Sequence, residues 1–213
     1  MPGGGDVLRL FRRDRDFMIV LNGNELMNSR MSGSEEALAL LTCERLRHSA
    51  APHLLIGGYG MGFTLRSALE VLPERAAVTV VELVPEIIAW ARGPMAQLEA
   101  GCLDDPRVEL VEGDVAALIV QARDRYDAIL LDVDNGPDGL TRLANNRLYS
   151  NAGLALAKGA LKQGGILAIW SAAPDAAFTR RLKDVGFAVE QVDVRARSNN
   201  KGPRHTIWLA VRV

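Results

Sequence analysis

The sequence predicts an α/β fold built on a doubly wound sheet of seven strands, six of them parallel and the last antiparallel. From His53 onward, short apolar strands alternate with helical segments, a pattern typical of parallel strands covered on both faces. Only the loop 195–204 joins the last two strands, which is too short for a parallel crossover, so the final strand must turn back. The chain has 213 residues, the length of one Rossmann-like domain.

Composition narrows the class of partner. Hydrophobic residues make up 48% of the chain and the formal net charge is -1, so no global attraction to nucleic acid or to an anionic membrane is expected. Two cysteines without CxxC spacing and three scattered histidines argue against a structural metal or a disulfide framework. No apolar run approaches the ~20 residues needed to span a bilayer. We expect a cytoplasmic protein with a small-molecule substrate, no metal, and no nucleic-acid or membrane partner.

The N-terminal part, residues 1–50, is expected to form a tail, a β-hairpin and a helix ahead of the nucleotide-binding domain at 51–213. Order should begin near Phe17, and Asn22-Gly23 supplies residues that tolerate the positive φ of a tight turn in FMIVLNGNELM. Ser32 with Glu35 predicts a capping box that opens the helix in EEALALLTCERLR. We interpret this unit as a lid or a dimer contact.

The elements of the main domain follow from the alternation of apolar and polar residues. Pro85 and Pro174 fit first-turn positions of two of its helices. The strands are expected near 53–57, 77–82, 107–111, 127–133, 165–170, 187–194 and 205–212. The helices are expected near 62–72, 84–92, 114–123, 151–162 and 174–185.

A glycine-rich loop follows the first of these strands, with Gly58, Gly60 and Gly62 at alternate positions. The spacing lets the backbone approach a ligand at a helix N-terminus. A dinucleotide fingerprint would need a third glycine where Phe63 stands, so the G-x-G-x-G form favours an S-adenosyl sulfonium nucleotide. The loop N–H groups could receive a carboxylate of that ligand. The alternative is a tight strand-to-helix turn without a ligand.

Acidic residues follow the next strands, where open α/β sheets bind their ligands. Glu82 ends the second strand and could accept both ribose hydroxyls. Asp114 follows the third and could bind the adenine amine or act as a helix N-cap. We therefore assign nucleotide binding to Gly58, Gly60, Gly62, Glu82, Leu83, Gly113, Asp114 and Asp132.

Asp132, at the end of the fourth strand, is the predicted catalytic residue, because a carboxylate there could stabilise the sulfonium or take a proton from the nucleophile. Substrate binding is assigned to Asp134 and to the basic loop residues Arg195, Arg197, Lys201 and Arg204. The loop could attract an anionic substrate. A turn-capping role for Asp134 and a merely solvated basic loop are the alternatives.

The segments GGYGMGFTLRSAL, VVELVPEII, DPRVELVEGDV and YDAILLDVD resemble the spermidine synthase family, the polyamine aminopropyltransferases, over roughly Met18 to Val213. The resemblance implies a methyltransferase-type fold and a homodimer or tetramer, of which we expect a homodimer. It also implies that Glu82 binds ribose, that Asp114 binds adenine, and that Asp132 deprotonates the attacking amine.

Three departures from the family pattern shape the functional hypotheses. Met61 stands where the family has an aspartate that holds the aminopropyl amine, the segment 33–37 replaces a Tyr-His-Glu segment, and a basic loop would repel a polycation. Methyl transfer from S-adenosylmethionine to a small acceptor is therefore favoured. The alternatives are aminopropyl transfer from decarboxylated S-adenosylmethionine to a polyamine, and a non-catalytic nucleotide-binding interaction module.

Overall fold

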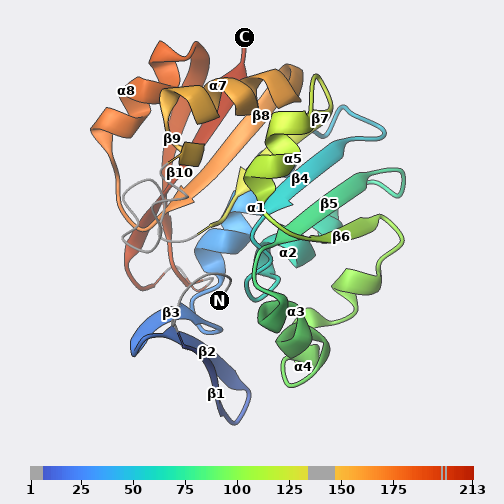
Figure 1. Cartoon of the computed structure of the whole chain (residues 1–213), viewed down its shortest axis with the longest axis vertical. Helices are drawn as coiled ribbons and strands as arrows, with labels where there is room; N and C mark the ends of the chain where they lie inside the picture. Colours follow the sequence, from blue (N-terminus) through green and yellow to red (C-terminus); the bar gives the residue numbers. More distant parts are fainter. Residues whose placement is uncertain (1–6, 134–146, 198, 200) are drawn as a thin grey trace.

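A computed structural model describes residues 7–133, 147–197, 199 and 201–213. A seven-stranded sheet forms the centre of the molecule, in the order β6-β5-β4-β7-β8-β10-β9, and a separate three-stranded sheet lies at one end (Figure 1). The central strands are β4 (His53–Gly57), β5 (Ala77–Glu82), β6 (Val108–Glu112), β7 (Tyr126–Leu131), β8 (Leu161–Ser171), β9 (Phe187–Arg195) and β10 (Arg204–Arg212).

The strand directions agree with the predicted doubly wound sheet. β4 pairs in parallel with both β5 and β7, and β10 runs antiparallel to both β8 and β9. The antiparallel strand is therefore inserted between two strands that share one direction, and β9 forms the edge. The carboxyl ends of β4, β5, β6 and β7 lie side by side, which is the arrangement that places a ligand site at this edge.

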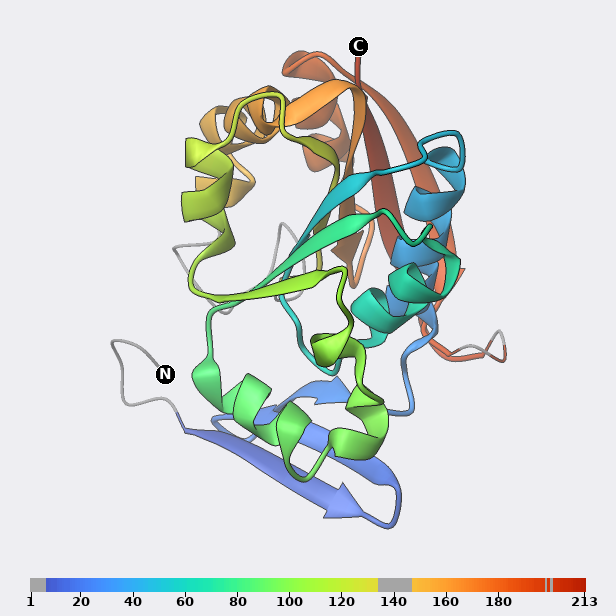
Figure 2. The ribbon, with the colours of Figure 1, turned by 90° about the vertical axis from the view of Figure 1, so that its right-hand side faces the viewer.

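Helices cover both faces of the sheet (Figure 2). One apolar core joins the sheet to the first group of helices and a second core joins it to the other group. The first group is α1 (Gly33–Arg45), α2 (Phe63–Val71) and α3 (Pro85–Arg92), and the second is α5 (Val115–Gln121), α7 (Asn151–Ala160) and α8 (Ala176–Asp184). Two short elements that the sequence did not predict, α4 (Ala96–Glu99) and η1 (Cys102–Asp104), precede β6.

The N-terminal unit is larger than predicted. The expected hairpin is present as β2 (Asp16–Leu21) and β3 (Asn24–Asn28), with Asn22 at φ 51 and Gly23 at φ 87 in its turn. A further strand, β1 (Leu8–Arg13), pairs antiparallel with β2, so the expected start of order near Phe17 is wrong. The charged composition of this strand concealed a half-buried alternation at Leu8 and Leu10.

Two local predictions about helix starts are also wrong. Ser32 already has helical angles, φ -83 and ψ -17, and its side chain makes no capping hydrogen bond to any described residue, so the capping box with Glu35 does not form. Pro174 lies before α8 because Asp175 is the N-cap of that helix, accepting hydrogen bonds from Ala177 N and Phe178 N. Pro85 does occupy the first turn of α3. Among the described residues, every helix is too short or too polar to cross a membrane.

Candidate active site

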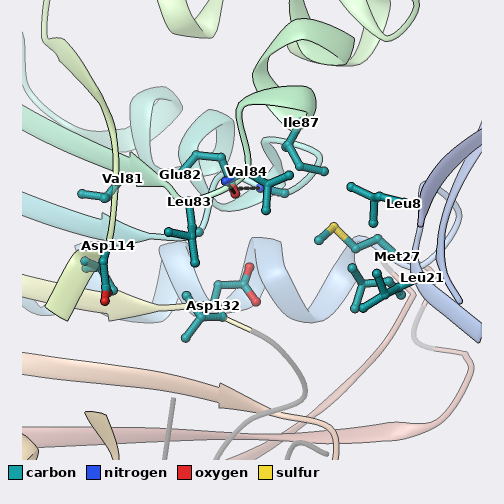
Figure 3. A pocket seen from close by; sticks show the side chains of 16 residues that line it. Leu8, Leu21, Met27, Val81, Glu82, Leu83, Val84, Ile87, Asp114 and Asp132 are labelled. Atoms are coloured by element: carbon teal, nitrogen blue, oxygen red, sulfur yellow. Dashed lines mark hydrogen bonds between the residues drawn. The ribbon is translucent and has the colours of Figure 1, made fainter. Parts of the chain in front are cut away.

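A pocket opens at the carboxyl ends of the parallel strands, between them and the three-stranded sheet (Figure 3). It brings together seven of the eight residues predicted to bind the nucleotide, while Gly62 lies outside its lining. The three-stranded sheet forms an apolar wall opposite these residues. The wall residues are Leu8, Leu21, Leu26 and Met27, and the predicted residues in the pocket are Gly58, Gly60, Glu82, Leu83, Gly113, Asp114 and Asp132.

The glycine loop passes tightly between β5 and β7. Gly58 N donates to Val81 O at 3.0 Å, and Asp132 N donates to Gly57 O at 2.9 Å. Gly58 has φ 85, and a Cβ at this position would lie 2.4 Å from the carbonyl oxygen of Asp132. Only glycine fits this approach of two backbones. The loop is therefore fixed against the carboxyl end of β7.

The N–H groups of this loop already have acceptors, which corrects the expectation that they would receive a ligand carboxylate. Gly60 N donates to Glu82 Oε2 at 3.4 Å and Gly62 N donates to Tyr59 O at 2.8 Å, while Gly58 N is bound to Val81 as described. A carboxylate at this loop would have to displace an internal acceptor.

Glu82 holds the loop in place through its carboxylate. It is 7% exposed, and it accepts hydrogen bonds from Tyr59 N at 2.9 Å and from Val84 N at 2.8 Å, in addition to Gly60 N. Burial raises the pKa of Glu82, and the backbone N–H groups around it oppose that rise. Oε1 accepts the Val84 N–H, and the backbone N–H of Leu83 also lowers the pKa of the Glu82 carboxylate.

Asp114 caps a helix and also lines the pocket. Its Oδ1 accepts the N–H of Ala116 at 2.8 Å, which makes it the N-cap of α5, and the residue also lines the pocket. The cap holds one carboxylate oxygen and fixes the side chain at the end of β6. The structure thus confirms the cap and leaves adenine binding as a prediction.

Asp132 points from the end of β7 into the space between Leu83 and Met27 (Figure 3). Thr64 Oγ1 on α2 donates to Asp132 Oδ2 at 2.9 Å. Burial raises the pKa of Asp132 to about 6, and the hydroxyl of Thr64 opposes the rise. Among the described residues no cation pairs with this carboxylate, so it is held in a form that can exchange a proton near neutral pH.

Glu35 is a residue that the sequence reasoning placed only in a capping box. The first turn of α1 carries it beside Asp132, and Thr64 Oγ1 lies 3.4 Å from the carbonyl oxygen of Glu35. The pKa of Glu35 is raised well above its usual value by burial, then by the charge of Asp132, then by Glu36. Looking for acids that directly follow a parallel strand could not find Glu35, because Glu35 lies on a helix that precedes the sheet in the sequence.

Met61, taken from the sequence as a lost amine clamp, does not face the pocket. It is 2% exposed and belongs to the apolar core, as does the neighbouring Tyr59. The Tyr59 ring lies under Gly62, where a Cβ would approach its hydroxyl oxygen to 2.6 Å. Tyr59 therefore turns inward and anchors the loop to the core. The identity of residue 61 carries no information about the ligand amine.

The basic residues lie elsewhere. Arg195, Arg197 and Arg204 line a separate concavity with Gly33, at the other flank of α1, and Lys201 lies in the same exposed loop. The structure does not bring these four side chains into the pocket with Asp132, so their contact with substrate stays a prediction. Asp134 lies outside the described residues.

Comparison with known proteins identifies the family. Residues 36–179 match the model of the spermine/spermidine synthase domain. The chain is 34% identical over 170 residues to polyamine aminopropyltransferase 1 of Streptomyces coelicolor, covering 73% of this chain and 31% of that protein. It is 32% identical over 151 residues to polyamine aminopropyltransferase 2 of Pseudomonas aeruginosa, covering 66% of this chain and 41% of that protein. The chain thus spans about a third to two fifths of these relatives.

The fold agrees with the family. The solved spermidine synthase of Thermotoga maritima superposes with a TM-score of 0.77 at 20% identity, covering 98% of this chain and 70% of that one. A probable spermidine synthase from Corynebacterium glutamicum gives a TM-score of 0.67 at 16% identity, with all of this chain and 79% of that one covered.

These matches overturn the favoured functional hypothesis. Methyl transfer is wrong as the main interpretation, because the family model and the curated relatives are those of aminopropyltransferases. Two of the arguments for that hypothesis, Met61 as a lost clamp and free N–H groups in the glycine loop, also fail in the structure. The chain belongs to the spermine/spermidine synthase domain family.

Proposed function

We propose that the protein transfers the aminopropyl group of decarboxylated S-adenosylmethionine to an amine acceptor of the polyamine class. The observation that carries the proposal is the charge of the pocket: its described lining contains Glu82, Asp114 and Asp132, and no Lys, Arg or His. Decarboxylated S-adenosylmethionine is a sulfonium with a terminal ammonium. Two positive charges and no carboxylate match a pocket lined by acids.

S-adenosylmethionine fits this pocket less well. Its carboxylate would need donors, and the N–H groups of Gly58, Gly60 and Gly62 are bound to Val81 O, Glu82 and Tyr59 O. An unpaired carboxylate near Glu82 and Asp132 would be opposed both by desolvation and by like charge. The loop geometry and the lining thus both favour the decarboxylated ligand.

The nucleoside would lie across the ends of β5 and β6. Glu82 would accept a ribose hydroxyl, and Asp114 would use the carboxylate oxygen that its cap does not hold. Apolar side chains of Val81, Leu83 and Val115 provide contact for the base. The apolar wall of the three-stranded sheet would close over the donor, which gives the N-terminal unit, residues 1–50, the role of a lid.

Asp132 would act as the general base. The acceptor enters as an ammonium and gives one proton to the Asp132 carboxylate, after which the neutral nitrogen attacks the carbon bound to sulfur. A C–N bond forms and the C–S bond breaks, with its electron pair left on sulfur, so methylthioadenosine leaves as a neutral thioether. Alignment of nitrogen, carbon and sulfur is the main requirement, and proton transfer adds typically ~10²–10⁴-fold.

The experiment is a direct assay of both donors with putrescine, read by mass spectrometry for methylthioadenosine, spermidine and methylated putrescine. We expect methylthioadenosine and spermidine in equal amounts from the decarboxylated donor, and binding of that donor at least about tenfold tighter than that of S-adenosylmethionine, which corresponds to about 1.4 kcal/mol. Asp132→Asn is the matched inactive control. Tighter binding of S-adenosylmethionine with a methylated product would overturn the proposal.

The family resemblance also supports a homodimer, which we carry as part of this proposal. Light scattering after size-exclusion chromatography tests it: a mass of twice the 23.1 kDa chain is expected, and a monomeric mass at assay concentration contradicts it.

A further inference from the structure

Thr64 lies at the start of α2, directly after the glycine loop, and its side chain is buried. It is the second residue of that helix and 3% exposed, and Gly62 at φ 78 is the N-cap. The loop in turn is bonded to the carboxyl end of β7, because Asp132 N donates to Gly57 O at 2.9 Å. The same loop thus sets the position of Thr64 relative to Asp132.

The hydroxyl of Thr64 has a closer and a more distant acceptor. Oγ1 lies 2.9 Å from Asp132 Oδ2 and 3.4 Å from the carbonyl oxygen of Glu35. Hydrogen bonds from a hydroxyl to an oxygen usually span about 2.5–3.0 Å, and a hydroxyl has a single hydrogen to give. The hydrogen therefore goes to Asp132 Oδ2. Within the described residues Oδ1 has no donor, so this oxygen is left for a ligand in the pocket that Asp132 lines (Figure 3).

The usual partner of a helical threonine hydroxyl is the backbone carbonyl four residues back. Thr42 on α1 follows this rule, since its Oγ1 donates to Leu38 O at 2.7 Å. Thr64 is too near the start of α2 for such a bond, because the residue four positions back, Gly60, lies in the loop. Its hydroxyl is therefore available to a different element of the fold, and it reaches the end of β7.

Acidic residues share the surroundings of Asp132. Glu35 on α1 interacts with it, because the pKa of Glu35 is raised by burial, then by the charge of Asp132, then by Glu36. Glu82 and Asp114 line the same pocket from the ends of β5 and β6. These acids disfavour the ionised form of Asp132, so a donor to its carboxylate opposes their effect.

The basic groups of the neighbouring elements are engaged elsewhere. Arg66 on α2 donates to a backbone carbonyl in α4. His53 begins β4 and Lys162 lies at the start of β8, where it forms an ion pair. His205 of β10 is bonded to Ser34, with 2.8 Å between its Nδ1 and the serine Oγ. In the described part of the chain, the carboxylate at the end of β7 is thus bonded to a hydroxyl and to no cation.

A neutral donor suits this position. A hydrogen bond to the ionised form of an acid favours that form. A lysine or an arginine in the same place would favour it too, but its positive charge would also offset the negative charge and repel a cationic ligand. The Thr64 hydroxyl stabilises the carboxylate and leaves its charge available to the sulfonium and the ammonium of the proposed substrates.

We propose that Thr64 is a positioning residue for the general base: its hydroxyl holds Oδ2 of Asp132 and leaves Oδ1 to take the proton of the acceptor amine. The inference rests on the proposed aminopropyl transfer, in which Asp132 is the base. An N–H bond of the ammonium breaks and an Oδ1–H bond forms, and the nitrogen keeps the electron pair with which it attacks the donor carbon. The hydrogen bond to Oδ2 weakens when the carboxyl group becomes neutral, so it favours return of the proton to solvent after each turnover.

Thr64→Val removes the hydroxyl and keeps the branched shape of the side chain. Loss of a bond to the ionised carboxylate raises the pKa of Asp132 above its wild-type value of about 6. We expect the acid limb of the kcat/KM profile to move up by about one pH unit, and kcat on the plateau above it to fall by about tenfold, because the carboxylate loses its fixed orientation. Thr64→Ser supplies the hydroxyl again and should restore the midpoint and most of the rate.

The shift of the midpoint can also be measured without substrate. In protein isotopically labelled at the aspartate carboxyl carbons, the chemical shift of Asp132 reports its ionisation, and Asp132→Asn identifies the signal. We expect a midpoint near pH 6 in the wild type and about one unit higher in Thr64→Val.

Thr42→Val is the matched control. Thr42 is also a buried helical threonine, and its hydroxyl donates to Leu38 O. Its substitution should leave the Asp132 midpoint and the rate unchanged. Thermal melting of every variant reports on folding.

The outcomes separate this inference from the function on which it rests. Spermidine formation by the wild type, with an unchanged Asp132 midpoint and an unchanged rate in Thr64→Val, would overturn the role of Thr64 and leave aminopropyl transfer intact. An equal shift in Thr42→Val would also overturn it, because the effect would then come from a general loosening of the fold. If the wild type forms no spermidine, the proposed function is wrong, and a shifted midpoint in Thr64→Val would then identify the hydrogen bond as structural only.

Discussion

The two ends of β7 carry acids with opposite surroundings. At the start of the strand, Asp127 Oδ2 lies 2.7 Å from Lys162 Nζ and 2.7 Å from the backbone nitrogen of His53, so the carboxylate is neutralised and bonded. Just after the end of the strand, Asp132 is bonded to a hydroxyl, and burial raises its pKa to about 6. Asp127 at the start of the strand thus stabilises the fold through an ion pair and a hydrogen bond. Asp132 after its end has a pKa close enough to neutral pH to gain or lose a proton.

The contrast teaches how to distinguish acids that stabilise the fold from acids that do chemistry. A paired, hydrogen-bonded carboxylate lowers the free energy of the folded state, whereas a partly buried carboxylate without a cation raises it. A folded domain retains the second kind where a ligand supplies the missing charge. The predictions below test this difference at Asp132, Glu82, Asp127 and the basic loop.

The largest effect is expected at Asp132. Asp132→Asn should lower kcat by about 10²–10⁴-fold, the usual contribution of a general base, because the amide cannot accept the amine proton. Thermal stability at pH 7 should be unchanged or higher, since an ionised group is removed from a site that raises its pKa. Steady-state release of methylthioadenosine and a melting curve measure the two. A variant that is strongly destabilised yet active would place Asp132 with Asp127 as a structural acid.

The pH dependence of the wild type should show that Asp132 favours catalysis and opposes stability when it is ionised. Asp132 accepts a proton only when ionised, so kcat/KM should fall about tenfold per pH unit below about pH 6. The stability contribution has the opposite sign. Because the folded pKa of this acid is raised, its contribution to stability is fully present below the ordinary pKa of 3.8 and is lost as the pH rises through about 6. Rate profiles and unfolding at pH 4 and pH 7, each compared with Asp132→Asn, separate this group from the other acids.

Glu82→Gln tests an acid that accepts backbone hydrogen bonds and also lines the pocket. The carboxylate accepts the N–H groups of Tyr59, Gly60 and Val84, and an amide would direct a donor at one of them. We expect donor binding to weaken by about 1.5–3 kcal/mol, the range for hydrogen bonds to charged groups. Titration calorimetry with decarboxylated S-adenosylmethionine measures the loss. Unchanged affinity would mean that Glu82 only supports the loop.

Substitution of Asp127 should lower the stability of the fold and leave catalysis unchanged. Asp127→Asn removes the charge opposite Lys162 and weakens the acceptor for His53 N. It should cost about 1–2 kcal/mol, at the lower end of the roughly 1.5–3 kcal/mol for hydrogen bonds to a charged group. Lys162 is 43% exposed, which limits the ion-pair part of that cost. Urea denaturation measures it. A fall in kcat of tenfold or more with an unchanged KM would break the distinction between the two ends of β7.

The smallest effect is expected in the basic loop. Arg197→Ala with Arg204→Ala should change turnover of a polyamine by less than about twofold at any salt concentration, because exposed substitutions away from a site seldom matter. Assays between low and high salt measure this. A clear loss at low salt would restore the loop to the substrate path and would favour an anionic acceptor.

Sequence patterns predicted the sheet almost completely, because each strand is determined by residues that are neighbours in the sequence. Strand boundaries such as 53–57 and 77–82 follow from runs of buried apolar residues, and the structure has both strands with these bounds. The position of Glu82 and Asp132 at strand ends then followed from the rule for open sheets. These features depend on residues that are close in the sequence.

Features that depend on distant contacts were missed. Glu35 is an ordinary helical acid until α1 packs against β7, and Met61 reads as a pocket residue until the Tyr59 side chain turns the loop into the core. The N–H groups of Tyr59 and Gly60 are likewise bound by Glu82, more than twenty residues away. The positions of Met61 and of the loop N–H groups bear directly on the choice of donor, which is why the predicted fold was right and the preferred chemistry was wrong.

The apolar wall of the pocket comes from a part of the chain that lies before the family segment. Leu8, Leu21, Leu26 and Met27 come from the first 28 residues, whereas the segment that matches the family model begins at residue 36. The wall and the acidic strand ends are therefore encoded in separate stretches of the chain. Substitutions in the first 28 residues can change the shape of the pocket while Asp132 and the glycine loop stay the same.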